Sequence, residues 1–365
     1  MELTREREEY RRKEVDAQAA CERDNDTPAR CSRRTFVTGL GVPIAAAWAP
    51  ARVLAGLGIF RSAGSAFAQP TQETPAGVMY PPVDLSYFDK AISSIAVGYA
   101  AITWGGDDRQ AIEDIAAVGF RGIQLRSNVV EEFNNRPDDL RSALGKRGLT
   151  MVALSSGDLS VDQPQSEQLV KHERNARFLR DAGGECLQVI DERPKDRAIA
   201  KEDYARMGEL LTKLGKRIAA LGISLGYHNH MGAMGETPEG VERILESSDP
   251  RYVKLELDVA HYFQGGGNPA EAIDRHSDRL LFLHIKDVKT LPAASGDMAG
   301  KQPYQFVELG RGNVDLPGVF HALKRTKFRG WAVVELDSVP DKSGTPKQSA
   351  LINRTYVEKV LGYRI

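Results

Sequence analysis

The sequence contains little cysteine and no long uninterrupted apolar run. It has 3 cysteines, and two of them, Cys21 and Cys31, precede the region where regular secondary structure is expected to begin. Cys186 would then be alone in the folded domain, which excludes an internal disulfide there. Because it lies within an apolar run, we interpret Cys186 as a small buried side chain.

The chain also lacks an excess of either charge. Its formal net charge is −1 at pH 7, with 49 Lys and Arg against 50 Asp and Glu. Such a balance is a poor match for nucleic acid or for an anionic membrane surface. No Gly-x-Gly-x-x-Gly motif follows the first predicted strand, which argues against a dinucleotide-binding fold.

Residues 1–68 have the features of an export signal. A charged segment is followed by SRRTFV at 32–37, by a weakly apolar stretch and by AFA at 66–68. The Arg pair resembles a twin-arginine signal, and the small-x-small pattern is typical of a leader-peptidase site. Prolines and arginines interrupt the apolar stretch, so we expect no stable membrane span. We predict a periplasmic protein with a linker at 69–92 and one domain at 93–365.

From residue 93 onward, apolar runs alternate with amphipathic stretches. Eight runs have the composition of strands: 94–103, 120–126, 149–155, 186–191, 223–230, 253–259, 280–288 and 331–337. Helical patterns occupy 109–118, 137–147, 168–181, 204–221, 239–247, 270–276, 316–324 and 348–360. This alternation predicts parallel strands, because each parallel connection needs a crossover. Eight such units fit a single closed (β/α)₈ barrel better than an open sheet.

Ionisable residues gather at the ends of four consecutive predicted strands. The segments are YHNH at 227–230, ELDVAH at 256–261, HIKD at 284–287 and ELD at 335–337. In this type of barrel, functional side chains come from the carboxyl ends of the strands. Period-2 alternation pairs these side chains on one face of each strand: His228 with His230, Glu256 with Asp258, His284 with Lys286, and Glu335 with Asp337.

Charged groups that point into a barrel need a compensating partner. A divalent cation shared by imidazoles and carboxylates provides one. Mixed nitrogen and oxygen ligands suit Mn²⁺, Co²⁺, Zn²⁺ or Fe²⁺, with Mg²⁺ as a further candidate. The strand ends therefore predict a divalent-metal site.

The ordered motifs resemble the xylose-isomerase-like superfamily of sugar isomerases and epimerases, and within it the inosose dehydratase-like branch. The matching segments are GYHNHMG at 226–232, LDVAH at 257–261, HIKD at 284–287, LGRGNVD at 309–315 and WAVVE at 331–335. The resemblance covers about residues 95–362. It implies a TIM barrel that binds a divalent metal and a small carbohydrate substrate.

The resemblance also implies one metal ligand from each of strands five to eight. These are His228 or His230, then Asp258, His284 and Glu335. Many epimerases of the superfamily carry a Glu where this chain has His-Asn-His. That difference favours the dehydratase branch over a mechanism with two glutamates.

Such a site supports chemistry through an enediolate, which leads to epimerisation, isomerisation or β-elimination of a keto-sugar or keto-polyol. Glu335 is our first candidate for the base, with His228 or His230 second. His261 is implied to face the substrate and is a further catalytic candidate.

Two more residues are candidates for contact with the substrate. Lys286 would stabilise the enolate or bind a hydroxyl group, and its alternative is a structural ion pair with Glu256 or Asp258. Trp104 is expected to stack on a sugar face beside His230 and His261, with core packing as its alternative. The segment 289–309 is long for a βα link, so it is expected to cover the site.

Two other functions remain open from the sequence. A carbohydrate-binding barrel without catalysis would keep the same fold, and an AP-endonuclease-like nuclease would use several metals and a basic groove. The net charge and the 7 histidines argue against the nuclease. A homo-oligomer is compatible with the sequence.

Overall fold

The computed structural model describes residues 95–291 and 303–365. The predicted export signal at 1–68 and the linker at 69–92 lie outside these residues. Within the two described ranges, no helix combines the length and the apolar character needed to cross a membrane.

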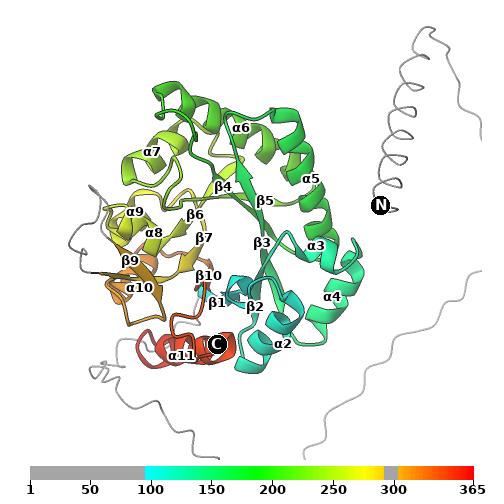
Figure 1. Ribbon diagram of the computed structural model, residues 1–365, viewed down its shortest axis with the longest axis vertical. Coiled ribbons are helices and arrows are strands. Elements are labelled where there is room, and N and C mark those ends of the chain that lie inside the picture. Colours follow the sequence, from blue (N-terminus) through cyan, green and yellow to red (C-terminus); the bar gives the residue numbers. More distant parts are fainter. Residues whose placement is uncertain (1–94, 292–302) are drawn as a thin grey trace, which may run out of the picture. The chain divides into compact units, whose positions relative to one another are not determined.

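Eight parallel strands close into one barrel, in the order β1-β10-β7-β6-β5-β4-β3-β2 (Figure 1). This confirms the predicted single (β/α)₈ fold. The strands are β1 Ile95–Ala100, β2 Gly122–Arg126, β3 Thr150–Leu159, β4 Cys186–Asp191, β5 Ser224–His228, β6 Val253–Asp258, β7 Leu280–Ile285 and β10 Gly330–Val334.

Helices surround the barrel and follow the predicted order (Figure 1). The longer ones are α2 Asp108–Val118, α4 Pro137–Gly145, α5 Gln165–Asp181, α6 Lys201–Ala219, α7 Pro238–Glu246, α9 Pro269–Arg275, α10 Leu316–Arg325 and α11 Pro346–Lys359. Three of them begin one or two residues before the predicted start, at Pro238, Pro269 and Pro346. Proline suits the first helical position, because its missing N–H has no partner there in any residue.

The largest departure from the predicted elements follows β7. The expected strand at 280–288 ends at Ile285, and the chain continues as β8 Asp287–Thr290, which pairs antiparallel with β9 Tyr304–Val307. The Asp287 carboxylate accepts hydrogen bonds from the backbone N–H groups of Gly310, Gly312 and Val314. This buried carboxylate therefore fixes the loop that follows the β8–β9 ribbon.

Short helices complete the elements of the described ranges. They are the 3₁₀ helix η2 Ala101–Trp104 and the helices α3 Val129–Glu132 and α8 Val259–Gln264. Because η2 begins at Ala101, strand β1 ends at Ala100, before the predicted end at residue 103. The α8 helix is capped by Asp258, whose carboxylate accepts hydrogen bonds from the N–H groups of Ala260 and His261.

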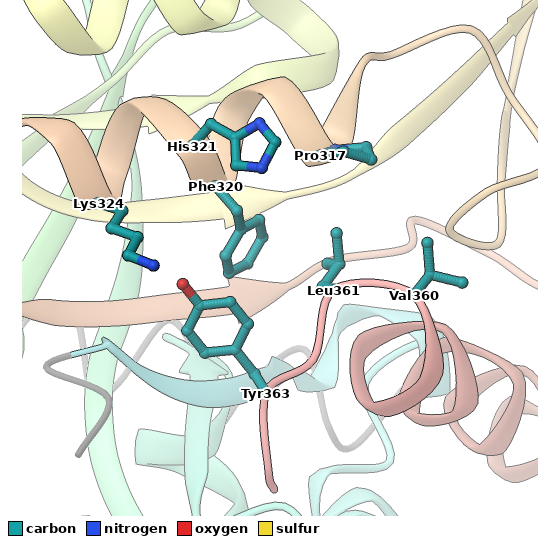
Figure 2. Close-up of a pocket in the computed structure, with 7 residues that line it drawn as sticks. All are labelled: Pro317, Phe320, His321, Lys324, Val360, Leu361 and Tyr363. Atoms are coloured by element: carbon teal, nitrogen blue, oxygen red, sulfur yellow. The ribbon is translucent and has the colours of Figure 1, made fainter. Parts of the chain in front are cut away.

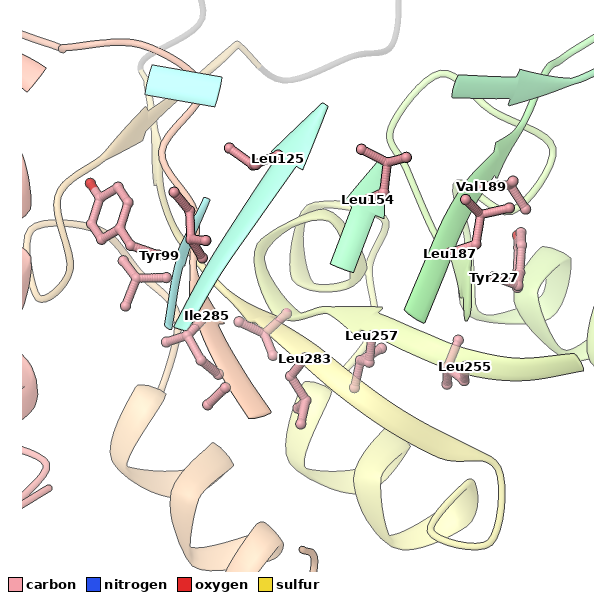
Figure 3. Close-up of a cluster of buried hydrophobic side chains, with 14 of the residues drawn as sticks. Tyr99, Leu125, Leu154, Leu187, Val189, Tyr227, Leu255, Leu257, Leu283 and Ile285 are labelled. Atoms are coloured by element: carbon pink, nitrogen blue, oxygen red, sulfur yellow. The ribbon is translucent and has the colours of Figure 1, made fainter. Parts of the chain in front are cut away.

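The strands separate two apolar layers. The larger layer lies between the strands and the helices and includes Tyr99, Leu125, Leu187, Tyr227 and Leu257, which Figure 3 shows along the strands. The smaller layer includes Ala100, Ala153, Cys186, Phe282 and Val333. The register places Cys186 opposite Ala153, and His284 opposite Val333. This smaller layer therefore lies on the strand face that carries the ionisable residues.

Cys186 is buried, as predicted, and burial raises the pKa of its thiol to about 12. It therefore stays a neutral thiol at physiological pH and packs as an apolar side chain.

A glycine makes close packing possible between α6 and α7. A Cβ atom added at Gly208 would overlap the backbone carbonyl of Ser247. We expect Gly208→Ala to lower the free energy of unfolding by about 1–3 kcal/mol through this overlap. Gly145→Ala is the matched control, because nothing lies within 4 Å of the added carbon, and it should be neutral or stabilising. Urea denaturation measures both, and equal stabilities would contradict this packing.

Candidate metal centre and active site

Five buried side chains converge at the carboxyl ends of β5, β6, β7 and β10. We call them the carboxylate–imidazole cluster: His228, Glu256, Asp258, His284 and Glu335. The register places His228 opposite Glu256, and Asp258 opposite His284. The His284 Nδ1 atom lies 3.4 Å from Glu256 Oε1, 3.7 Å from Asp258 Oδ2 and 3.3 Å from Glu335 Oε2. The His228 Nδ1 atom contacts Glu256 Oε2.

Four atoms of the cluster are buried without a hydrogen-bond partner. They are His228 Nδ1, Glu256 Oε1, Asp258 Oδ2 and His284 Nδ1. Buried polar atoms without a hydrogen bond are costly, and here four of them are gathered in one place, where they contact one another only as ion pairs. Ligand atoms of His228, Glu256 and His284 lie within 4.8 Å of one another, and so do those of Asp258, His284 and Glu335. The residues present therefore fit a divalent cation with nitrogen and oxygen ligands.

Three histidines form a further group of possible metal ligands, which shares His228 with the cluster. Ligand atoms of His228, His230 and His261 are also within 4.8 Å of one another. However, His261 Nδ1 accepts a hydrogen bond from the Met231 N–H at 3.2 Å, and its Nε2 lies 3.3 Å from Lys286 Nζ. His230 Nδ1 donates to the Met231 carbonyl oxygen at 2.7 Å. Of the two candidates from β5 and its following loop, His228 is the one whose Nδ1 lies in the cluster, in contact with Glu256 and without a hydrogen bond.

Lys286 is fully buried and surrounded by carboxylates. Its Nζ lies 3.0 Å from Glu335, 2.6 Å from Asp337 and 3.8 Å from Asp258. Burial alone would lower the pKa of Lys286, but the three carboxylates outweigh it and raise this pKa above its usual value. Lys286 is therefore a fixed cation at neutral pH. Its ion pairs include Asp258, one of the two partners expected for a structural role, together with Glu335 and Asp337.

The charges of Glu335 and His284 depend on each other. Burial would raise the pKa of Glu335, but His284 and Lys286 outweigh it and lower this pKa to about 2. Burial would lower the pKa of His284, but Glu256 and Glu335 outweigh it and raise this pKa to about 9. Without a metal, a protonated His284 therefore partly compensates the carboxylates.

Two glutamines, from β2 and β4, orient the cluster. Gln124 Oε1, on β2, lies 2.6 Å from His284 Nε2, and Gln124 Nε2 donates to Gln188 Oε1, on β4, at 3.2 Å. Gln188 Nε2 in turn donates to Glu256 Oε2 at 3.4 Å. Because the Gln124 oxygen can only accept, His284 Nε2 must carry a proton. In the neutral imidazole, this leaves the Nδ1 lone pair directed at the carboxylates.

The roles of three residues in this arrangement were not predicted from the sequence. Glu256 shares a strand face with Asp258, and this alternation is the signal that would have identified it as a ligand candidate. Gln124 and Gln188 interrupt the apolar runs of β2 and β4. A buried amide in such a run needs partners, and this is the signal that would have identified them.

Trp104 lies on η2, after β1. Its ring packs edge-on against Tyr99, with centroids 5.8 Å apart, and its indole N–H donates to Asp114 Oδ2 at 3.0 Å. These contacts tie Trp104 to β1 and α2. Its contact with a sugar stays a prediction.

The β8–β9 ribbon reaches the cluster through Phe306. The ring of Phe306 lies 4.1 Å from Lys286 Nζ and 5.0 Å from the ring of His261. This described part of the segment 289–309 covers Lys286 with an apolar surface, as expected for that segment.

Two hollows of the described residues could hold a ligand, a cleft and a small pocket. The cleft, of about 520 Å³, begins at His230 and Met231 and extends over the ends of β3 and β4 and the loop that follows β4. The pocket, of about 20 Å³, lies instead between α10 and the C-terminal segment (Figure 2). The cleft adjoins the cluster, because the ring of its lining residue His230 lies 5.7 Å from the ring of His228. It is therefore the better candidate for the substrate.

The contact between Gln124 and His284 generates a testable prediction. Gln124→Leu removes the acceptor that holds the His284 proton on Nε2, so we expect a roughly 10- to 100-fold weaker affinity for a divalent metal. Titration with Mn²⁺ and Zn²⁺ measures this affinity. Gln168→Leu is the control, since Gln168 is also buried but bonds to the backbone around Ser160. Equal metal affinity of Gln124→Leu and the parent protein would contradict the proposed orientation.

Comparison with known proteins agrees with this geometry. The family model of the xylose isomerase-like TIM barrel matches residues 112–355. An inosose dehydratase of Lacticaseibacillus casei is 24% identical over 299 residues, covering 73% of this chain and 98% of the relative. An inosose dehydratase of Geobacillus thermodenitrificans is 26% identical, covering 74% and 98%.

Other relatives extend the comparison. A rhizopine catabolism protein of Rhizobium meliloti is 29% identical, covering 69% of this chain and 85% of the relative. Among solved structures, the IOLI protein with a bound zinc atom has the same fold, with a TM-score of 0.61 and 20% identity, covering 74% and 99% of the two chains. The matched motifs, the closed barrel and the family model agree: the chain belongs to the xylose isomerase-like TIM-barrel family.

Proposed function

We propose that this protein is a divalent-metal-dependent enzyme that removes an α-proton from a keto-sugar or keto-polyol to give an enediolate. The observation that carries the proposal is the group of unpaired buried atoms in the carboxylate–imidazole cluster. The inosose dehydratases among its relatives support a carbohydrate substrate. The zinc atom bound in the IOLI structure supports a metal at this type of barrel.

His228, Glu256, Asp258, His284 and Glu335 would hold the cation. A bound divalent cation would supply a Lewis acid and a template for a carbonyl oxygen and a neighbouring hydroxyl group. Mn²⁺, Co²⁺, Zn²⁺, Fe²⁺ and Mg²⁺ all remain candidates.

Lys286 would stabilise negative charge on the substrate oxygen. Its ion pairs with Glu335 and Asp337 fix the ammonium group in place. A preoriented cation in a site with little water stabilises developing charge strongly, because no reorganisation is needed during the reaction.

Among the candidate bases, the geometry favours His230. Glu335 is ion-paired with Lys286, and both nitrogens of His261 are engaged. His230 donates its Nδ1 proton to Met231, so its Nε2 is left to take a proton, and the residue lines the cleft. We therefore propose His230 as the base in place of Glu335, our first candidate from the sequence.

From the enediolate, loss of a β-hydroxyl group would give dehydration, and reprotonation would give epimerisation or isomerisation. We favour dehydration, because inosose dehydratases are among the relatives. The carbohydrate-binding barrel without catalysis is the second candidate, and exchange of the substrate α-proton separates the two.

Export to the periplasm also remains our proposal. It is supported by the Arg33–Arg34 pair and the small-x-small site at 66–68. Cleavage before Gln69 in a secreted sample would test it, and full-length protein in the cytoplasm would contradict it.

The enzymatic proposal predicts metal-dependent exchange of the substrate α-proton with solvent. In D₂O with Mn²⁺, we expect deuterium at the α-carbon of an inosose or another keto-sugar, and none after chelation. His230→Gln should lower the rate by about 10²–10⁴-fold, as for loss of a general base. His321→Gln, on the exposed face of α10, is the matched control and should keep the parent rate.

Metal binding measured on the same variants separates the two roles. His230→Gln should retain the metal, whereas Asp258→Asn should lose it. Saturable sugar binding with no exchange on any keto-sugar would contradict catalysis and favour the binding barrel.

A further inference from the structure

The cleft beside His230 provides space outside the metal cluster. It has a volume of about 520 Å³, within the usual range of small-molecule sites. Its lining comes from the ends of β3 and β4 and from the loops after β4 and β5, and none of the five residues of the carboxylate–imidazole cluster belongs to it. A substrate whose reacting carbon lies at the cluster would therefore extend into the cleft with another part of the molecule.

The cleft is lined by three carboxylates and two cations. Asp158, Asp191 and Glu192 provide the carboxylates, and Arg193 and Lys195 provide the cations. Lys195 is paired with Glu192 at 2.8 Å, and Arg193 donates to Glu236 at 3.0 Å. A phosphate or carboxylate ligand would meet cations that already have partners, together with three acidic side chains. A neutral ring with several hydroxyl groups matches this lining better, because each hydroxyl both donates and accepts.

The floor of the cleft is preformed. The buried Asp191 carboxylate accepts hydrogen bonds from the Tyr227 hydroxyl at 2.7 Å and from the Gly235 N–H at 3.0 Å. Arg193 also donates to the Ala233 carbonyl oxygen at 3.2 Å. These bonds hold the loops after β4 and β5 together, so little ordering is required when a ligand binds.

We infer that the cleft binds a second, uncharged sugar ring that is linked to the ring reacting at the cluster. The substrate class would then be keto-disaccharides or keto-glycosides rather than free keto-monosaccharides. This inference rests on the proposed function, because it takes the cluster as the place of reaction.

Binding of disaccharides tests the inference without turnover. By calorimetry on the metal-loaded protein, we expect maltose or cellobiose to bind at least tenfold more tightly than glucose. The double variant Asp158→Ala/Lys195→Ala removes two exposed side chains of the cleft and should lose this advantage while glucose affinity stays unchanged. Asp138→Ala/Lys146→Ala, with two exposed charges on and next to α4, is the matched control and should keep it.

Two results would overturn the inference: equal affinities for glucose and both disaccharides, or an unchanged advantage in the cleft variant. Either result could occur while the parent protein still exchanges the α-proton of an inosose in the presence of metal. In that case the subsite fails and the proposed function stands. Loss of exchange with a retained disaccharide preference would instead contradict the proposed function and leave a disaccharide-binding cleft.

Discussion

The central constraint on this structure is the burial of several carboxylates beside very few permanent cations. Glu256, Asp258 and Glu335 are buried and Asp337 is half-buried, while Lys286 is the one lysine or arginine paired with them among the described residues. Removing each charge from water costs several kcal/mol unless it is paired. A protonated His284 offsets part of this cost in the protein alone. A divalent cation would offset more of it and would use the atoms that now have no hydrogen bond.

Apolar side chains and two glutamines of the barrel strands surround this cluster. Small and apolar side chains such as Ala153, Cys186 and Phe282 occupy the strand face that also carries the cluster. Gln124 on β2 and Gln188 on β4 then contact His284 on β7 and Glu256 on β6. The strands thus provide a frame in which the orientations of two metal-ligand candidates, His284 and Glu256, are fixed by neighbours that are not themselves ligands.

The sequence was sufficient to predict the fold and the strands that carry the site. Alternating periodicity identified all eight barrel strands, and the strand-end motifs identified four of the five cluster residues. The β8–β9 ribbon was not predicted, because it depends on contacts between residues distant in sequence. These are the pairing of β8 with β9 and the hydrogen bonds from the N–H groups of Gly310 and Gly312 to the Asp287 carboxylate. His228 and His230 likewise share a strand pattern. Three-dimensional contacts distinguish them, because His228 Nδ1 contacts Glu256 whereas His230 Nδ1 donates to the Met231 carbonyl oxygen.

Equilibrium dialysis against Mn²⁺, Co²⁺, Zn²⁺ and Fe²⁺ is the most direct test of the central claim. We expect one tightly bound ion per chain in the parent protein. We also expect the ion to be lost in the double variant Asp258→Asn/His284→Gln, which removes two of the unpaired atoms. No saturable binding of any of these ions to the folded parent protein, or equal binding to the variant, would contradict the claim that the carboxylate–imidazole cluster is a metal centre.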